Sequence, residues 1–389
     1  MCSKTVLIFR EKLLPISETF IVAQASALTT YRPVYAGLRR TKPRLRLEPE
    51  ILLSRSDGLR AAAGARLFGK LPGHFRYMNE LAKTTPALIH AHFAIDGSVA
   101  LPILRRLHVP LVVTLHGGDV TATDATIATS LRGRQYLSRR EDLWAKASLF
   151  LCVSHHIRQR ALAVGFPEEK LRVHYTGIDC EQFKPLEASD RDAEMVVFVG
   201  RLVEKKGCEY AIRALAGLRS EGTPARLVVI GDGPLRGSLQ ALARSLGIQC
   251  EFLGAQSAEE VRRHIGRARV LLNPSVTARN GDSEGFGMVF AEAQAMATPV
   301  ASTLHGGIPE AVSDGRTGLL ALERDEITLT KNLRSLLTDE RLWRELSTNG
   351  VRWVRERFNL RHQTHLLEGL YDEAIGLPRD CLRAQPVEC

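Results

Sequence analysis

Short apolar runs rich in β-branched residues alternate with helical patterns along most of the chain. In the first half the runs are Val6–Phe9, Leu88–Ala91, Leu111–Leu115 and Leu149–Val153. Short runs that are mostly apolar are typical of parallel strands buried on both faces. The first half therefore predicts a doubly wound α/β sheet.

The same pattern starts again in the second half, with runs at 195–199, 226–230, 250–253, 270–272 and 299–301. The polar segment from Phe183 to Asp192 separates the two series and has no periodicity of its own. We expect an N-terminal domain at 1–185, a C-terminal domain at 186–358, and a helix at 359–378 that crosses back to the first domain.

Composition excludes several broad classes. The chain has 389 residues, of which 44% are hydrophobic and 25% charged, as in ordinary globular proteins. No apolar run approaches the ~20 residues that a membrane span needs. The seven cysteines form no Cys-x-x-Cys pair, so we expect free thiols in a cytoplasmic protein.

The net charge of +10 is concentrated in one region. Residues 36–83 hold eleven Lys and Arg against four Asp and Glu, which favours an anionic partner. The stretch from Arg39 to Lys83 also contains apolar residues beside basic ones (Leu59, Ala63, Leu67, Phe68 and Leu71 beside Arg60, Arg66 and Lys70). This pattern suits an anionic membrane surface and suits an ordinary domain face equally well.

The segment Asp282–Ala293 has the strongest chemical signal. Gly285 and Gly287 follow a predicted strand and lead into a helix, whose first amides and positive dipole end suit a diphosphate. Glu284 and Glu292 would be ~12 Å apart along a helical path, a spacing that fits two ends of a sugar nucleotide. Alternatively, the glycines only end a loop and the glutamates only enrich a helix start.

Two further strand ends carry candidate ligand-binding residues. Gly200–Gly207 follows a predicted strand, so Arg201 and Lys206 would reach phosphate oxygens at the carboxyl edge of the sheet, unless they are merely solvated charges. His116 follows the strand at 111–115 and is able to donate a hydrogen bond to a sugar, although lone histidines are more often structural. His90 and His92 share a strand face, but no nearby carboxylate or thiolate completes a metal site, so we expect none.

Several motifs in a fixed order resemble glycosyltransferase family 4, the retaining nucleotide-sugar enzymes of GT-B fold, and in particular the exopolysaccharide and colanic-acid-type branch. The motifs are Gly200-Arg201-Leu202 with Lys206-Gly207, Gly231-Asp232-Gly233-Pro234, Asn273-Pro274-Ser275, the Glu284 and Glu292 pair, His305–Glu310, and Asp314–Leu319. The N-terminal half agrees more loosely, through Ser17–Phe20, His90–Phe93 and His116-Gly117. The resemblance implies two Rossmann-like doubly wound domains that face each other across a cleft.

The resemblance also implies a role for each candidate residue. Arg201 and Lys206 would neutralise the donor diphosphate, and Glu292 would bind the ribose. Glu284 would face the donor sugar, His116 would bind that sugar from the other domain, and the amides of Gly285, Phe286 and Gly287 would hold sugar and phosphate oxygens. No metal or other cofactor would be needed.

Three departures from the family pattern stand out. Thr298 replaces a common Gly, Gln294 replaces a common Met, and Pro15–Phe20 stands where the family has a glycine pair after the first strand. Neither Thr298 nor Gln294 touches a proposed charge contact, whereas Pro15–Phe20 bears on how the acceptor is held.

The expected function is retaining transfer of a sugar from a UDP- or GDP-sugar to a growing, lipid-linked polysaccharide intermediate. Attack from the front face would let the leaving phosphate help to deprotonate the acceptor, while the protein supplies positioning and electrostatics. We expect Glu284→Ala and Lys206→Ala to abolish transfer with little change in thermal unfolding.

Two other functions remain open from the sequence. The first is a sugar-nucleotide epimerase or another GT-B enzyme. The second is a nucleic-acid-binding protein, which the charge permits; the basic residues are not interleaved with aromatic ones, so we expect no nucleic-acid partner. The protein would be cytoplasmic, with a peripheral place on the inner face of the plasma membrane as an option.

Overall fold

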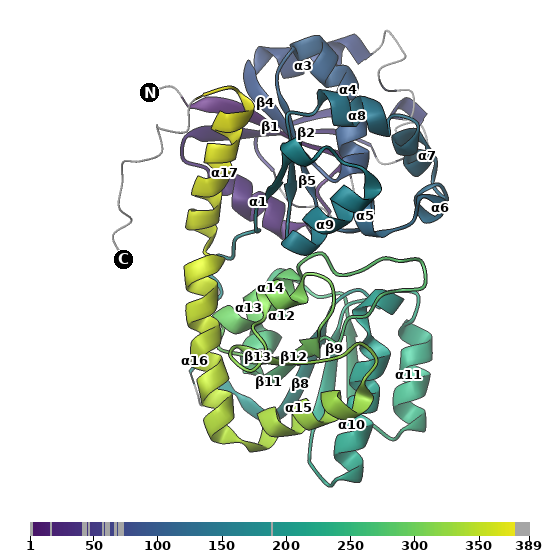
Figure 1. The fold of residues 1–389 in the computed structure, drawn as a ribbon, viewed down its shortest axis with the longest axis vertical. Helices are drawn as coiled ribbons and strands as arrows, with labels where there is room; N and C mark the ends of the chain where they lie inside the picture. Colours follow the sequence, from purple (N-terminus) through teal and green to yellow (C-terminus); the bar gives the residue numbers. More distant parts are fainter. Residues whose placement is uncertain are drawn as a thin grey trace. The chain divides into compact units, whose positions relative to one another are not determined.

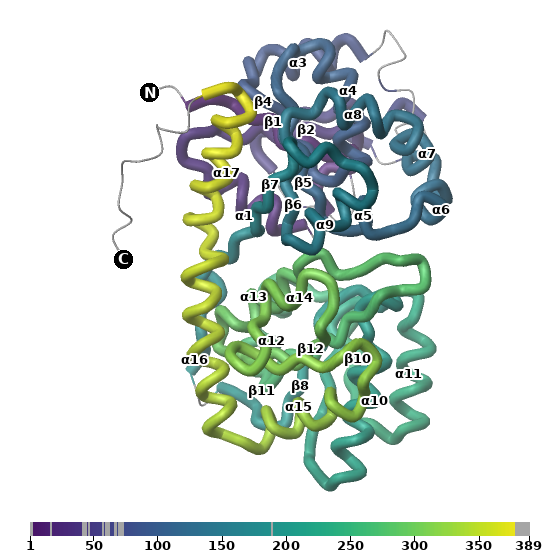
Figure 2. The backbone as a smooth tube through the Cα atoms, viewed as in Figure 1, coloured from purple at the N-terminus to yellow at the C-terminus, as the bar shows by residue number. Residues whose placement is uncertain are grey.

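The computed structural model describes residues 3–15, 18–40, 45, 47–56, 58, 63–65, 68, 74–187 and 190–377. Contacts divide the chain into two compact units (Figures 1 and 2). Unit 1 comprises the chain up to Val153, then Ile157–Gly177, and the segment from Leu360 onward. Unit 2 comprises Ser154–His156 and Ile178–Asn359. The division falls before Ile178, whose N–H donates to the carbonyl of Phe358, while the sequence placed it at 185.

Unit 1 contains a seven-stranded, wholly parallel sheet with the order β3-β2-β1-β4-β5-β6-β7. The strand order reverses direction beside β1, as in a Rossmann fold. The strands are β1 (Lys4–Leu13), β2 (Tyr31–Arg40), β3 (Glu50–Ser54), β4 (Pro86–His92), β5 (Leu111–Leu115), β6 (Leu149–Cys152) and β7 (Leu171–Val173).

Helices cover both faces of this sheet. The core on one face joins strand residues such as Ile8 and Val112 to α1 and α17, and α4 packs on the opposite face beside Val113. The helices of unit 1 are α1 (Thr19–Ser26), α3 (Phe75–Lys83), α4 (Ala94–Leu107), α5 (Gly118–Thr121), α6 (Asp124–Ile127), α7 (Leu131–Leu137), α8 (Arg140–Lys146), α9 (His155–Val164) and α17 (Leu360–Ala374).

Unit 2 repeats the architecture with six parallel strands in the order β10-β9-β8-β11-β12-β13. The strands are β8 (Asp192–Val199), β9 (Arg226–Ile230), β10 (Cys250–Gly254), β11 (Ala268–Leu272), β12 (Val300–Thr303) and β13 (Gly318–Ala321). The helices are α10 (Cys208–Ser220), α11 (Arg236–Ser245), α12 (Ala258–Arg267), α13 (Met288–Ala295), α14 (Ile308–Ala311), α15 (Glu326–Thr338) and α16 (Glu340–Arg357). Residues of α10, α11 and α15 complete the core on one face.

The C-terminal segment confirms that the last helix returns to the first unit. Helix α16 ends at Arg357, and α17 begins at Leu360 and packs against the sheet of unit 1. The buried carboxylate of Glu368 on α17 accepts hydrogen bonds from the N–H groups of Thr29, Thr30 and Tyr31 at 2.7, 2.6 and 3.3 Å. This carboxylate accepts hydrogen bonds from three amides at the start of β2, so it joins α17 to the N-terminal part of unit 1.

The sequence identified the central strands but missed four others. These are β2, β3, β7 and β13. Pro33 and Gly37 interrupt the apolar pattern of β2, and the other three are edge strands of three to five residues, too short for a pattern to show.

Most of the basic, apolar pattern expected between Arg39 and Lys83 lies outside the described residues, including Leu59, Arg60, Arg66, Leu67, Lys70 and Leu71. Of the described members, Phe68 is buried and packs against Tyr77, so it is not part of an exposed stripe. Arg39 is ion-paired with Glu11 at 3.1 Å, and Arg40 with Glu50. Within the described chain, no helix has both the length and the apolar character needed to cross a bilayer.

Candidate functional site

The candidate residues of unit 2 lie in loops at the carboxyl ends of neighbouring parallel strands. Arg201 and Lys206 follow β8, Asn273 follows β11, and His305 follows β12. Since β8, β11, β12 and β13 are adjacent in the sheet, their carboxyl ends lie at one edge, where open α/β sheets bind ligands.

Two of the predicted residues are in direct contact: Lys206 and Glu284 form an ion pair through Nζ and Oε2. Their side chains are 19% and 11% exposed, so the pair is largely shielded from water. Beside it, Lys205 donates to Asp282 at 3.0 Å and to the carbonyl of Ser283 at 3.4 Å. Two consecutive lysines thus hold two acidic positions of the glycine-rich loop.

The electrostatics of Glu284 follow from this arrangement. Burial alone would raise the pKa of its carboxyl group, but the charges of Lys206 and Lys205 outweigh burial and lower that pKa to about 2. Glu284 is therefore a permanent carboxylate at neutral pH.

Glycines at 306 and 307 allow the β12 loop to approach the acidic loop. A Cβ on Gly307 would lie 2.0 Å from the carbonyl oxygen of Gly285, and one on Gly306 would lie 2.3 Å from that of Glu284. Gly306 also has a φ of 54°, which glycine adopts without strain. The close approach lets the N–H of Gly307 donate to the carbonyl of Glu284 at 3.0 Å.

The turn at 285–287 leads into α13 as the sequence predicted, but the helix begins only at Met288. Gly287 has a φ of 81° and stands at the start of the helix. Among the described residues no hydrogen bond is found for the N–H groups of Gly285 and Gly287. The ring of Phe286 is buried against Phe358, with centroids 5.0 Å apart, so this side chain anchors the turn.

Arg201 differs from the paired lysines. It is exposed, and no ion pair or hydrogen bond of its guanidinium is found within the described part of the chain. The strand end that precedes it is held by Asn273, whose side chain accepts from the N–H of Val199 at 3.1 Å and donates to its carbonyl at 2.7 Å. Among the described residues, Arg201 is thus an unpaired cation close in sequence to Lys206.

Glu292 lies on α13 and has the opposite electrostatic character to Glu284. Burial raises the pKa of its carboxyl group to about 7. No cation pairs with its carboxylate among the described residues. The two glutamates of the motif are thus charged and nearly neutral, respectively, in slightly acidic solution.

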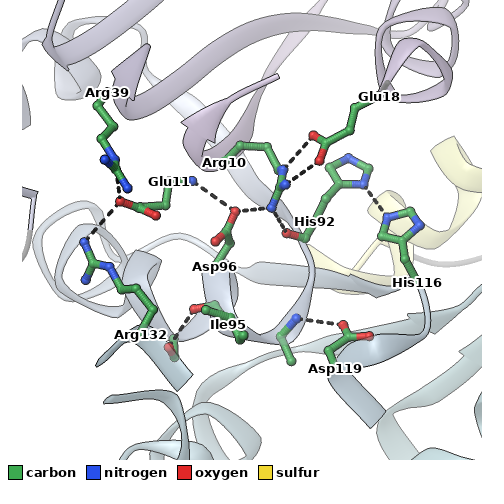
Figure 3. Close-up of polar contacts among 12 residues, drawn as sticks. Arg10, Glu11, Glu18, Arg39, His92, Ile95, Asp96, His116, Asp119 and Arg132 are labelled. Carbon is green, nitrogen blue, oxygen red and sulfur yellow. Dashed lines mark hydrogen bonds and ion pairs between the residues drawn. The ribbon is translucent and has the colours of Figure 1, made fainter. Parts of the chain in front are cut away.

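His116 lies in unit 1, in the loop after β5. Its Nε2 is 3.1 Å from Nδ1 of His92 (Figure 3). Its ring centroid lies 4.6 Å from that of Phe93 and 5.2 Å from that of Phe20. Burial, together with the nearby charge of Arg10, lowers the pKa of His116 to about 3. The imidazole is therefore neutral at physiological pH and acts through hydrogen bonds.

A charged network that the sequence did not predict supports this histidine. Arg10 on β1 pairs with both Glu18 and Asp96 and donates to the carbonyl of His92 at 3.2 Å (Figure 3). Asp119 accepts from the N–H groups of Ala94 and Gly117 at 2.9 and 3.0 Å, which links α4 to the histidine loop. No local motif signals such a network, because its members come from three separate strand ends.

The expected absence of a metal site stays a prediction. His90 is engaged by the hydroxyl groups of Tyr371 and Thr114 at 2.6 and 2.7 Å, which leaves neither nitrogen for a metal. In the described ranges, no three His, Cys, Asp or Glu side chains gather in a way that would hold an ion.

Two of the three departures from the family pattern, Thr298 and Gln294, make defined hydrogen bonds. Thr298 donates to the carbonyl of Ile265 at 2.9 Å and accepts from Arg191 at 3.1 Å. Gln294 donates to the carbonyls of Phe290 and Ala311 at 3.0 and 2.9 Å. Both side chains thus hold the C-terminal end of α13 and the turn that follows it.

Two family profiles match the chain. The profile described as glycosyl transferases group 1 matches residues 180–353, and the one described as Glycosyltransferase Family 4 matches residues 35–182. The chain is 33% identical over 260 residues to the putative colanic acid biosynthesis glycosyltransferase WcaL of Escherichia coli, covering 64% of this chain and 62% of that protein. It is 32% identical to the amylovoran biosynthesis glycosyltransferase AmsK of Erwinia amylovora, covering 64% and 61%. The match thus spans about three fifths of these two relatives.

Further similarities cover more of the relative. The chain is 30% identical to a GDP-mannose-dependent alpha-(1-6)-phosphatidylinositol monomannoside mannosyltransferase of Mycolicibacterium smegmatis, covering 67% of this chain and 69% of that protein. Its fold matches the Anabaena protein Alr3699/HepE, solved with UDP and glucose, with a TM-score of 0.74 at 18% identity over 95% of this chain and 100% of that one. Sucrose-phosphate synthase from Thermosynechococcus elongatus gives a TM-score of 0.76 at 20% identity, covering 95% and 98%.

These matches, with the two doubly wound parallel sheets, confirm the expected GT-B fold class. The roles of the site residues stay predictions. The chain belongs to glycosyltransferase family 4.

Proposed function

We propose that this protein is a retaining glycosyltransferase that moves a sugar from a UDP- or GDP-sugar to a growing, lipid-linked polysaccharide intermediate. The observation that carries the proposal is that the exposed Arg201 and the Lys206–Glu284 pair lie in loops of unit 2 at the carboxyl ends of adjacent strands. The similarity to proteins named for colanic acid and amylovoran biosynthesis supports a polysaccharide product.

Arg201 and Lys206 would neutralise the donor diphosphate. Arg201 is exposed and has a guanidinium fork that suits two phosphate oxygens. The N–H groups of Gly285 and Gly287, with the amide of Phe286, would add donors at the start of α13. Because these groups supply positive charge themselves, we propose that transfer needs no metal ion and no other cofactor.

The two glutamates would contact hydroxyl groups of the donor. Glu284 is a fixed carboxylate and would accept hydrogen bonds from the donor sugar. Glu292 lies one helical turn into α13 and would accept from the ribose hydroxyls once ionised. His116, neutral in unit 1, would offer an uncharged hydrogen bond to the donor sugar.

The proposed reaction breaks the bond between the anomeric carbon and the diphosphate oxygen and forms a bond to an acceptor hydroxyl on the same face. The leaving phosphate oxygen takes the acceptor proton. The protein contributes orientation and stabilises the negative charge that develops on the diphosphate, for which Arg201 and Lys206 are suited. No protein nucleophile is required by this scheme.

We propose that the protein acts in the cytoplasm, at the inner face of the plasma membrane, because a lipid-linked acceptor would be held there. The basic region near Arg39 is a candidate for contact with anionic lipids. Co-sedimentation with neutral and anionic liposomes tests this point, and equal partitioning with both would argue against electrostatic docking.

The function is tested by incubating the protein with radiolabelled UDP-glucose, UDP-galactose or GDP-mannose and a lipid extract from a polysaccharide-producing bacterium, in EDTA. The expected result is label in the lipid fraction, with the anomeric configuration of the donor retained by NMR. An inverted product would refute the retaining mechanism. Isomerised donor without transfer would favour the alternative of a sugar-nucleotide epimerase.

A further inference from the structure

Glu323 lies just after β13, and its carboxylate accepts several hydrogen bonds within unit 2. Its carboxylate accepts from the N–H of Thr277 at 2.7 Å, from the hydroxyl of Thr277 at 3.0 Å, and from Nδ1 of His305 at 2.6 Å. Arg324 adds an ion pair to Glu323 at 3.2 Å and donates to the carbonyl of Thr277 at 2.6 Å. One side chain thus links the loops that follow β11, β12 and β13.

These hydrogen bonds determine the ionisation state of the Glu323 carboxylate. Burial would raise the pKa of Glu323, but the donors from Thr277 and His305 lower it. Glu323 is therefore ionised and has no proton to donate, so Nδ1 of His305 must carry the proton that the two groups share.

The other nitrogen of His305 faces a backbone donor. The N–H of Glu284 points at Nε2 of His305 at 3.0 Å. Nε2 must therefore be unprotonated, and the tautomer is defined: Nδ1 donates to Glu323 and Nε2 accepts from Glu284. The His305 side chain is 1% exposed, so water is not available to replace either partner.

The chain of contacts ends on a residue of the candidate site. The N–H of Glu284 is held by His305, its carbonyl by the N–H of Gly307 at 3.0 Å, and its carboxylate by Lys206. Both peptide groups that flank Glu284 are thus held by the loop after β12. His305 and Gly307 contact the backbone of Glu284 and thereby set the direction of its carboxylate.

We propose that His305 and Glu323 form a positioning pair that holds the backbone of Glu284, and that this pair controls turnover of the donor rather than its binding. The proposal rests on the role given to Glu284 in the proposed function. The two residues do not touch the ligand groups assigned above; they act through Glu284. A displacement of a positioning contact by about 1 Å is able to cost about 100-fold in rate, which is the scale of effect expected here.

Two substitutions of His305 separate this role from general stability. His305→Gln places an amide oxygen near the position of Nε2 and retains an acceptor for the N–H of Glu284. His305→Asn places its amide near the position of Nδ1, so it retains the contact with Glu323 and leaves the N–H of Glu284 without an acceptor. Both replace a buried imidazole with a neutral amide, which makes each the control for the other.

The activity measurement is the release of UDP from UDP-glucose, or of GDP from GDP-mannose, with water or added lipid extract as acceptor. We expect turnover to fall about 100-fold in His305→Asn and to stay within about 10-fold of the wild type in His305→Gln. Affinity for the free nucleotide, measured by calorimetry, should stay within about twofold in both variants. Equal turnover in the two variants, or a parallel loss of nucleotide affinity, would overturn the proposal.

A second measurement does not depend on activity. Long-range ¹H–¹⁵N NMR of histidine side chains should show His305 with its proton on Nδ1, and amide exchange at Glu284 should be faster in His305→Asn than in His305→Gln. A proton on Nε2, or equal exchange in the two variants, would contradict the pairing. If the wild type releases no nucleotide from either donor, the proposed function is in doubt, while these spectra still decide whether the pair holds Glu284.

Discussion

Removing the charge of Lys206 tests the buried ion pair with Glu284. The substitution Lys206→Met keeps the length of the side chain but leaves the carboxylate of Glu284 buried without its closest cation. Lys205→Met is a matched control, because Lys205 has nearly the same side-chain exposure, 20% against 19%, while its partner Asp282 is 24% exposed against 11% for Glu284. Breaking a pair is costly mainly when the remaining charge is buried.

The magnitude follows from the pKa of Glu284. The folded-state value of about 2 lies below the ordinary value of 4.5, a difference worth about 3 kcal/mol at 1.36 kcal/mol for each pH unit. Because the folded-state pKa is depressed, this stabilisation is fully present above pH 4.5 and is lost as the pH falls toward 2. Lys206 contributes most to this lowering of the pKa, ahead of Lys205 and His305. At pH 7 we therefore expect Lys206→Met to lower the Tm by roughly 6–12 °C, on the scale of 2–4 °C for each kcal/mol.

The assay is differential scanning calorimetry at pH 7 on the wild type, both lysine variants, and the double variant Lys206→Met/Glu284→Gln. Lys205→Met should cost about 1 kcal/mol or less, as a more exposed pair does. The double variant should recover part of the loss, because no buried charge remains. Equal Tm values for Lys206→Met and the wild type, or equal losses for the two lysines, would refute the reasoning. The sequence alone suggested little stability loss at Lys206, since it does not reveal that the partner carboxylate is buried.

Three further predictions concern other parts of the chain. Arg201→Ala should leave the Tm unchanged, because the side chain is exposed and unpaired among the described residues. The same substitution should weaken UDP or GDP binding about 10- to 100-fold, as measured by calorimetry. Lys331→Ala, at another exposed position, serves as the control. Glu292→Gln should raise the Tm at pH 8 and not at pH 4, because a folded-state pKa of about 7 against an ordinary 4.5 makes ionisation favour the unfolded chain as the pH rises through that window. An unchanged Tm difference across that range would contradict the raised pKa. Glu368→Ala should release α17 from unit 1, because three backbone amides lose their acceptor at about 1–3 kcal/mol each, and limited proteolysis should then cut the chain near Asn359; equal protection in wild type and variant would argue against it.

The central strands of both sheets were predictable because burial on two faces makes them apolar throughout. Val6–Phe9 and Met195–Val199 lie in the middle of their sheets, as the pattern indicated. The edge strand β13 has four residues and no distinctive pattern, and β2 carries a proline. For such strands the pairing partner decides the structure, and the partner is not visible in a local window.

The candidate site was predictable where a motif is local and not where it is assembled. Glu284, Lys206 and Arg201 were predicted from the glycine-rich turns around them, and the contact between Lys206 and Glu284 is a direct result of the parallel sheet. The partnership of His305 with Glu323 joins residues that follow different strands, and that of Arg10 with Asp96 joins a residue of β1 to one in α4. Only the fold brings such residues together, so no spacing rule reveals them.

The pKa values also required the structure. Glu284 and Glu292 belong to the same motif, yet their pKa values shift in opposite directions. At Glu284 two lysines outweigh burial and lower the pKa, whereas at Glu292 burial alone raises it. Sequence spacing treats them as equivalent acids, whereas their surroundings make one a permanent carboxylate and the other a group that titrates near neutrality.

The most direct test of the central claim is calorimetric titration of the full chain with UDP, GDP and ADP in EDTA and again in magnesium. The account predicts that one uracil or guanine nucleotide binds in EDTA with an affinity that magnesium does not raise, because Arg201 and Lys206 supply the positive charge. Binding that appears only with magnesium would contradict metal-independent recognition of the diphosphate. Failure of all three to bind under both conditions would contradict the assignment of the unit 2 sheet edge as a nucleotide-sugar site.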